Sequence, residues 1–176
     1  MYIKYIDECG YDWAMRGIGL SYKRKYSRFK AGQIAKKLSH KDGGHNKFLE
    51  SMQVWLEIKA PLYWWKQFDT YRVGVTKQSE STMHTIMRKP LTQEDFQYPI
   101  FTNTLKDLNS AIEWGDFATV NNNLPSGYLQ TRIVNTNYKT LRHICQQRKV
   151  HKLHEWTYFC DYVQKKLKYS EFIKEL

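Results

Sequence analysis

Arg148 is the residue whose type and position in this sequence most directly suggest chemistry. It falls on one face of a predicted helix with Leu141, Ile144 and Cys145, so its guanidinium should point toward the interior or into a cleft. A buried guanidinium needs an anionic or carbonyl partner, because an unpaired buried charge is very costly. The other interpretation is that Arg148 ends its helix and satisfies the last carbonyl groups there.

Two histidines near the end of the chain, His151 and His154, are spaced so that both imidazoles could face one metal ion, and Glu155 follows them. No third ligand has a motif spacing relative to this pair. We therefore predict no metal site.

Two further stretches have residue types suited to anion binding. The run Ser79-Glu80-Ser81-Thr82 could form a turn whose backbone N–H groups bind an anion, although a solvated loop is the simpler interpretation. The basic cluster Lys23-Arg24-Lys25, Arg28, Lys30 and Lys36-Lys37 is interleaved with the aromatic residues Tyr22, Tyr26 and Phe29. Such a cluster could bind a nucleic-acid backbone and stack bases, but no nucleic-acid fold motif accompanies it.

The composition restricts the class of protein and of partner. The chain has 176 residues and a formal net charge of +11, from 28 Lys and Arg against 17 Asp and Glu, and 15% of its residues are aromatic. This length and balance predict one globular domain over residues 1–176 and exclude a disordered or fibrous chain. Positive charge beside many rings suits nucleotides, nucleotide cofactors or single-stranded nucleic acid.

The cysteines and the apolar segments indicate where the protein works. Cys9, Cys145 and Cys160 are odd in number and lack CxxC spacing, so we expect neither a disulfide framework nor a cysteine zinc site. No segment reaches the roughly 20 apolar residues of a membrane helix, and residues 1–10 do not resemble a signal peptide. A cytoplasmic protein without a membrane partner is the expectation.

The first half of the chain predicts a helix, a strand and a second helix. A helix over residues 27–39, with Phe29 on its apolar face, should end at Asp42-Gly43-Gly44. Residues 52–60 alternate apolar with polar side chains, which predicts a strand with one buried face. Pro61 then stands where proline opens a helix.

The second half predicts a loop followed by helices and one strand. Residues 73–99 have little periodicity and predict a long loop with short helical pieces. Residues 104–119 predict a helix, 121–127 a loop and 128–134 a strand. Two helices close the chain, the first from about Asn137 to Arg148 with Thr136 or Asn137 as N-cap. The second has an apolar 3-4-3-4 spacing through Leu153, Trp156, Cys160, Val163 and Leu167.

Two blocks of the sequence contain motifs in a recognisable order. Gly44-His45-Asn46-Lys47-Phe48-Leu49-Glu50-Ser51 precedes the first strand, and the next helix contains Gln67 and leads to Thr70-Tyr71-Arg72. Farther on, Leu124-Pro125 precedes the second strand, and residues 137–148 read N-x-K-x-L-x-H-x(4)-R. These blocks resemble the flavin-dependent thymidylate synthases, which have a GHxSPFEH-type turn, an R-H-R signature and an L-P…N-x-R-x-L-x-H-x(4)-R segment. The resemblance implies a single α+β domain with a small antiparallel sheet packed by helices.

The sequence departs from this family where the family binds phosphate. Thr70-Tyr71-Arg72 replaces R-H-R, and Asn121 replaces the arginine before the Leu-Pro pair. Lys139 replaces an arginine and keeps the charge without the planar fork. The family's E-x-S-x-R can be aligned on Glu80 or on Ser81, and neither alignment keeps its arginine. The sequence therefore has many basic residues, but several of the positions where the family has phosphate-binding arginines lack one.

The resemblance also implies roles for individual residues. Arg148 would be the catalytic residue and would also bind substrate, because it would stabilise negative charge on the pyrimidine ring and make C5 nucleophilic. Gln67, Glu80 and Ser81 would contact the nucleotide. Lys47 could restore part of the charge missing at Thr70. The implied cofactor contacts are His45, Lys47, Arg72, Asn137, Lys139 and His143.

Two functions follow from the resemblance. The first is reductive methylation, or another C5 modification, of dUMP or a related pyrimidine nucleotide by a homotetramer, with FAD as cofactor and with NADPH and methylene-tetrahydrofolate as co-substrates. The second is a homologue that binds a nucleotide or nucleic acid without flavin chemistry. The missing arginines favour the binding protein, whereas the retained Gln67, Asn137, His143 and Arg148 favour the enzyme. We predict the enzyme.

Overall fold

A computed structural model of the protein describes residues 1–21, 23, 27–41 and 44–174. The elements in chain order are β1 (Tyr2–Cys9), α1 (Tyr11–Leu20), α2 (Arg28–Ser39), the 3-10 helix η1 (Lys47–Ser51), β2 (Gln53–Pro61), α3 (Leu62–Phe68), β3 (Val75–Ser79), α4 (Thr82–Thr85), the 3-10 helix η2 (Gln93–Asp95), α5 (Thr102–Glu113), α6 (Phe117–Asn123), β4 (Leu129–Asn137), α7 (Tyr138–Arg148), α8 (His154–Lys166) and the 3-10 helix η3 (Ser170–Phe172).

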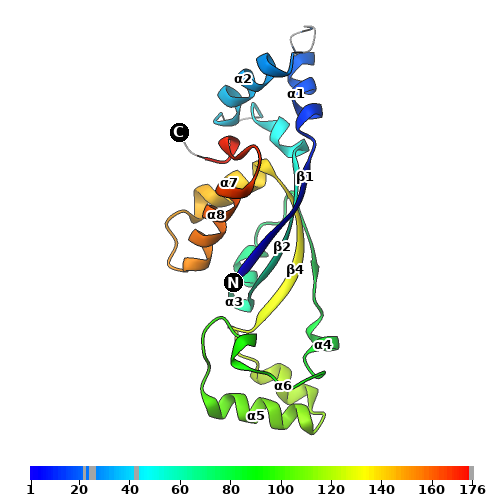
Figure 1. Cartoon of the computed structure of the whole chain (residues 1–176), viewed down its shortest axis with the longest axis vertical. Helices are drawn as coiled ribbons and strands as arrows, with labels where there is room; N and C mark the ends of the chain where they lie inside the picture. Colours follow the sequence, from blue (N-terminus) through cyan, green and yellow to red (C-terminus); the bar gives the residue numbers. More distant parts are fainter. Residues whose placement is uncertain (22, 24–26, 42–43, 175–176) are drawn as a thin grey trace. The chain divides into compact units, whose positions relative to one another are not determined.

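The strands form one four-stranded antiparallel sheet in the order β1-β2-β4-β3 (Figure 1). The register of β2 against β4 is marked at both ends by backbone hydrogen bonds. The Tyr138 N–H donates to the Met52 carbonyl, and the Leu62 N–H donates to the Tyr128 carbonyl, each at 3.0 Å. The predicted fold class, α+β with a small antiparallel sheet and helices, is confirmed.

The β2 strand confirms the alternation in its sequence. Val54, Leu56 and Ile58 are fully buried, while the residues between them are half-buried. Pro61 has an extended backbone and is both the last strand residue and the N-cap of α3. The helix therefore begins one residue after the predicted proline start.

Two strands and one α-helix of the described residues, β1, β3 and α1, were absent from the sequence-based prediction. β1 and α1 lie in a stretch that we assigned to no element, and β3 lies in the segment 73–99, where we predicted no strand. β3 is an edge strand of five residues, none of them fully buried. An edge strand with little buried surface carries no alternating apolar signal. The short helical pieces predicted for this segment are present as α4 and η2.

The helix predicted over residues 104–119 is two helices. Gly115 has φ +71°, a left-handed conformation that suits glycine and ends α5. Asp116 then caps α6, since its Oδ1 accepts a hydrogen bond from the Thr119 N–H at 3.0 Å. Residues 121–123, predicted as loop, are consequently helical.

The helices α2, α7 and α8 lie where the sequence predicts them. Phe29 was predicted to lie on the buried face of α2, and this prediction is wrong. Phe29 is 74% exposed, and alanines occupy buried positions of the helix. Asp42 and Gly43 of the predicted helix end, and Tyr22, Arg24, Lys25 and Tyr26 of the basic cluster, lie outside the described residues.

The chain divides into two compact units. The first unit is Met1–Tyr2, Glu57–Thr70 and Lys77–Ile133, and the second unit is Ile3–Leu56, Tyr71–Thr76 and Val134–Leu176. The core of the first unit is built on Ile86, Leu91, Phe96, Leu108, Ala111, Val120 and Tyr128. The assignment of the whole chain to one domain stays a prediction.

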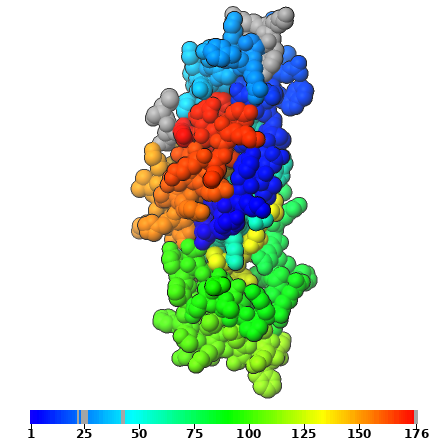
Figure 2. All heavy atoms as spheres, viewed as in Figure 1, coloured from blue at the N-terminus to red at the C-terminus, as the bar shows by residue number. Residues whose placement is uncertain are grey.

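Within the second unit, β1 from Ile3 onward is hydrogen-bonded to the C-terminal segment. In Figure 2 the C-terminal segment, in red, lies against the N-terminal segment, in blue. The Tyr5 N–H donates to the Tyr162 hydroxyl at 2.8 Å, and the Lys168 N–H donates to Glu8 at 3.0 Å. Cys145 and Cys160 are both buried in this unit. No helix in the described part of the chain is long and apolar enough to cross a membrane.

Candidate functional site

Arg148, at the end of α7 in the second unit, is held by two aromatic rings. Its Nε donates a hydrogen bond to the Tyr71 hydroxyl at 2.8 Å. Its guanidinium carbon lies 4.7 Å from the centre of the Trp156 ring and 5.5 Å from that of Tyr71. Rings at this distance attract a cation by their quadrupoles and restrict its orientation. The Arg148 side chain is half-buried, and these contacts restrict where its guanidinium can lie.

Tyr71 connects this arginine to the neighbouring glutamine. The buried hydroxyl of Tyr71 accepts from Arg148 and donates to the Gln147 Oε1 at 3.0 Å. The edge of the ring also meets His143, with ring centres 6.3 Å apart. Partial burial, and next the positive charge of Arg148, lower the pKa of His151. The charge of Arg148 therefore disfavours protonation of the His151 imidazole.

The start of α7 is anchored by Asn137, a predicted cofactor contact. Asn137 is buried and caps the helix, since its Oδ1 accepts from the Thr140 N–H at 2.9 Å, so the N-cap prediction is confirmed for Asn137 rather than Thr136. Its Nδ2 closely faces Gly74, whose φ is +69°. Asn137 therefore has a structural role of its own.

Two other predicted cofactor contacts, Lys139 and His143, follow at four-residue spacing on α7 and both reach the surface. Lys139 forms an ion pair with Glu50 of η1, which partly neutralises its ammonium. His143 is exposed beside Tyr71. The predicted contact Arg72 is exposed in the loop that follows Tyr71. These residues bring cationic and imidazole groups to the surface of the second unit.

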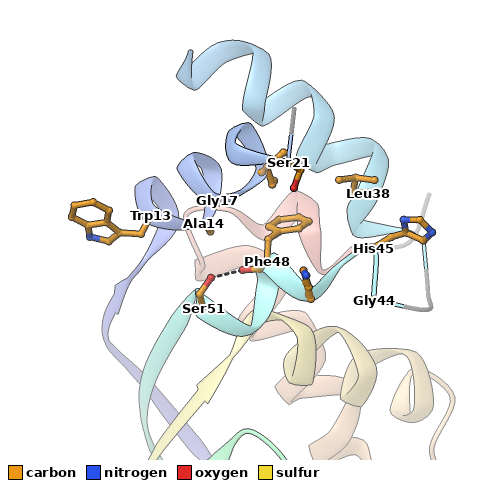
Figure 3. A pocket seen from close by; sticks show the side chains of 11 residues that line it. Trp13, Ala14, Gly17, Ser21, Leu38, Gly44, His45, Phe48 and Ser51 are labelled. Atoms are coloured by element: carbon orange, nitrogen blue, oxygen red, sulfur yellow. Dashed lines mark hydrogen bonds between the residues drawn. The ribbon is translucent and has the colours of Figure 1, made fainter. Parts of the chain in front are cut away.

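A cavity of about 530 Å³ lies between α1, α2 and η1 in the same unit (Figure 3). Its lining includes the predicted cofactor contacts His45 and Lys47, both exposed, and the buried ring of Phe48. Trp13 and His45 lie at opposite sides of it, and the Trp13 ring points outward (Figure 3). In the part of the chain that the structure describes, no carboxylate pairs with Lys47. The cavity thus combines an apolar floor with a cation at its edge.

The predicted nucleotide contacts Gln67, Glu80 and Ser81 belong to the first unit. Gln67 is half-buried on α3. Glu80 follows β3, and its Oε2 accepts from the Thr131 N–H at 3.2 Å. Ser81 is the N-cap residue of α4, and its carbonyl accepts a hydrogen bond from the Thr85 hydroxyl at 2.8 Å. The segment 79–82 is therefore fixed by α4 and β4 rather than being a solvated loop.

Comparison with known proteins identifies the fold. No model of a known protein family and no curated protein sequence matches the chain. Two crystal structures of ThyX from Helicobacter pylori, a flavin-dependent thymidylate synthase complexed with FAD and dUMP, superpose on it with TM-scores of 0.82. One match has 14% identity and covers 99% of this chain and 98% of that chain, and the other has 15% identity and covers 99% and 100%. The chain has the fold of a flavin-dependent thymidylate synthase.

Within this thymidylate synthase fold, sequence reasoning missed the residue that holds Arg148. Tyr71 drew attention only because it replaces the histidine of the R-H-R signature. The signal that could have found it is its residue type, because a tyrosine has an apolar ring with a polar tip and its hydroxyl usually finds a hydrogen-bond partner when the ring is buried. Its partners lie 76 and 77 residues away in the sequence, so no local pattern indicates them.

The described residues contain no cluster of side chains that could bind a metal ion. No three His, Cys, Asp or Glu side chains there are placed to hold an ion. The His151 Nδ1 instead accepts a hydrogen bond from the Leu153 N–H at 3.1 Å.

Proposed function

We propose that the protein is a flavin-dependent thymidylate synthase-like enzyme that methylates, or otherwise modifies, C5 of dUMP or a related pyrimidine nucleotide. The observation that supports this most is the fixed guanidinium of Arg148 on Trp156 and Tyr71. Arginine stays charged at all working pH values, so it can stabilise negative charge that develops on a pyrimidine ring. A guanidinium already held in position does this without reorganising during the reaction.

The residues of the second unit suit a flavin dinucleotide. Lys47 and Arg72 are exposed cations that would take the diphosphate, and His45 and His143 are exposed rings that would lie against its aromatic parts. Lys139 contributes less charge because of its ion pair with Glu50. When bound, FAD supplies the hydride of such a reaction, with NADPH and methylene-tetrahydrofolate as co-substrates.

Three further nucleotide contacts are proposed from the motif resemblance alone. Gln67, Glu80 and Ser81 are proposed to contact the pyrimidine nucleotide, and Arg148 both to bind it and to act in catalysis. We also propose that the protein is one functional domain that assembles as a homotetramer. Both proposals follow from the fold and from the motif resemblance.

The enzyme proposal is tested with the variant Arg148→Lys and the control Arg28→Lys. Arg28 is also an arginine beside a tyrosine ring, but it lies on α2 in an exposed ion pair with Asp12. We expect both variants to acquire the visible absorbance of bound flavin on incubation with FAD. Formation of the methylated nucleotide should be lost only in Arg148→Lys. Absence of flavin absorbance in the unmodified protein, or equal turnover in the two variants, would overturn the proposal.

A specific observation also supports a second function, the binding of nucleotides or nucleic acid without flavin. The side chain that stands where the family has an imidazole, Tyr71, is buried and hydrogen-bonded to its neighbours. Such a protein would bind dUMP or a single-stranded oligonucleotide with no flavin present. Oligonucleotide binding should weaken steeply with salt if the basic surface carries it, whereas a flat salt dependence would exclude nucleic acid.

A further inference from the structure

A second cavity, of about 340 Å³, lies wholly within the first unit. It is bordered by β2, by the segment from the end of β3 to Asp95, and by the start of β4. Its volume lies at the lower end of the range for small-molecule sites. The polar side chains that matter here are those of Lys59, Arg88, Lys89, Glu80, Asp95 and Tyr128.

Three of these side chains are cations without anionic partners. Lys59 is half-buried on β2, and Arg88 and Lys89 are exposed after α4. Among the residues that the structure describes, none of the three side chains forms an ion pair or a hydrogen bond. Cations gathered at one cavity repel one another, and an anion bound among them relieves that repulsion.

The two carboxylates of the cavity are held by other donors instead of by these cations. The Glu80 Oε2 accepts from the Thr131 N–H at 3.2 Å. The Asp95 Oδ2 accepts from the Thr92 N–H at 2.8 Å and from the Thr92 hydroxyl at 3.0 Å. Each carboxylate has about four acceptor positions, so each can accept further hydrogen bonds. Hydroxyl groups of a sugar are suitable donors for them.

Tyr128 adds one neutral donor. Its ring is buried against Phe96, with ring centres 5.9 Å apart, and in the described residues its hydroxyl has no hydrogen-bond partner. Burial, and next the charges of Glu80 and Asp95, raise the pKa of Tyr128 to about 12. The hydroxyl is therefore protonated at neutral pH and can donate to a ligand oxygen.

We propose that this cavity binds a sugar phosphate, with Lys59, Arg88 and Lys89 around the phosphate. Glu80 and Asp95 accept hydrogen bonds from the sugar hydroxyls. A mixed set of three cations and two carboxylates suits this group, because the phosphate oxygens bind the cations while the separate sugar hydroxyls donate to the carboxylates. The choice of a nucleotide as the carrier of the sugar phosphate rests on the proposed function. In that case the cations of this cavity replace the arginines that the phosphate-binding motifs lack.

The test is calorimetric titration of the full chain, without flavin, with dUMP, deoxyuridine and ribose 5-phosphate. We expect dUMP to bind at least about tenfold more tightly than deoxyuridine, since the charge-assisted phosphate contacts are absent from the nucleoside. Ribose 5-phosphate binding without dUMP binding would assign the site to a free sugar phosphate. Equal affinities for dUMP and deoxyuridine, or no binding of either phosphate ester, would overturn the proposal.

Matched variants locate the binding. The double variant Lys59→Gln/Arg88→Gln and the single variant Lys89→Gln should each weaken phosphate-ester binding, the double variant by about tenfold or more. Lys106→Gln, an exposed lysine on α5 outside the cavity, should bind as the unmodified protein does. Unchanged affinity in both cavity variants would overturn the inference. If the protein bound the phosphate esters as proposed but took up no flavin, only the proposed enzyme activity would be refuted. If the double variant Lys59→Gln/Arg88→Gln showed flavin-dependent turnover with an unchanged KM for dUMP, only this binding site would be refuted.

Discussion

The substitution Tyr71→Phe removes the hydroxyl oxygen that is bonded to both Arg148 and Gln147. A hydrogen bond to a charged group contributes about 1.5–3 kcal/mol and a neutral one about 1 kcal/mol. Because Arg148 is half-buried and water can replace part of what is lost, we expect the free energy of unfolding to fall by about 2 kcal/mol. For a chain of 176 residues this lowers Tm by about 4–8 °C.

Urea unfolding followed by tryptophan fluorescence measures this loss, and a double-mutant cycle with Arg148→Met isolates the pair. The coupling energy between the two substitutions should be about 1–2 kcal/mol, because each removes one partner of the same bond. Tyr158→Phe is the control, since in the described part of the chain the exposed hydroxyl of Tyr158 has no hydrogen bond. If Tyr71→Phe resembled the control within about 0.5 kcal/mol, or the coupling vanished, Tyr71 would not be what holds Arg148.

Two further predictions concern the backbone and the acid range. Gly74→Ala places a Cβ about 2.4 Å from the Asn137 Nδ2 at a left-handed φ. We therefore expect urea unfolding to show a loss of stability of about 1–3 kcal/mol. Gly127→Ala is the control, because its new Cβ has no neighbour within 4 Å, and an equal loss of stability in the two variants would contradict the prediction. Burial acts to raise the pKa of Asp69, but hydrogen bonds and charges from Lys77 and Arg132 outweigh it and lower that pKa. This stabilisation is present above the unfolded carboxyl pKa of about 4 and is lost as pH falls through the lowered folded pKa. Unfolding midpoints of Asp69→Asn and the unmodified protein should therefore differ at pH 7 and converge in acid, and a constant difference would refute the argument.

The sequence predicts those parts of the fold whose signals are local. β2 alternates strictly and buries one face, and Asn137 caps α7 three residues from the N–H that it binds. β3 has no such signal, because an edge strand buries little and its pairing with β4 is a long-range contact. The break at Gly115 was missed because the apolar spacing continues past it. Local periodicity therefore gives most helices and the central strands, but not the edge of the sheet.

The residues of the candidate site also fall into those that local sequence motifs predict and those that they do not. Motif order led to Arg148 and to the fold, since those residues follow one another at fixed spacing. The aromatic partners of Arg148 come from a loop and from α8, and only the folded chain brings them together. The cations Lys59 and Arg88 are also far apart in sequence, whereas the dense basic run at residues 23–25 attracts attention first. The number of basic residues in a stretch of sequence therefore does not predict which basic side chains line the same cavity in the folded chain.

The bonds of Tyr71 also couple three positions of the chain. Its hydroxyl serves Arg148 and Gln147 at once, so the effect of a substitution at position 71 depends on what stands at positions 147 and 148. A phenylalanine at position 71 should therefore destabilise the protein less where residues 147 and 148 no longer bond to it. Substitutions at these three positions are expected to show epistasis, although position 71 is 76 and 77 residues away from the other two in the sequence.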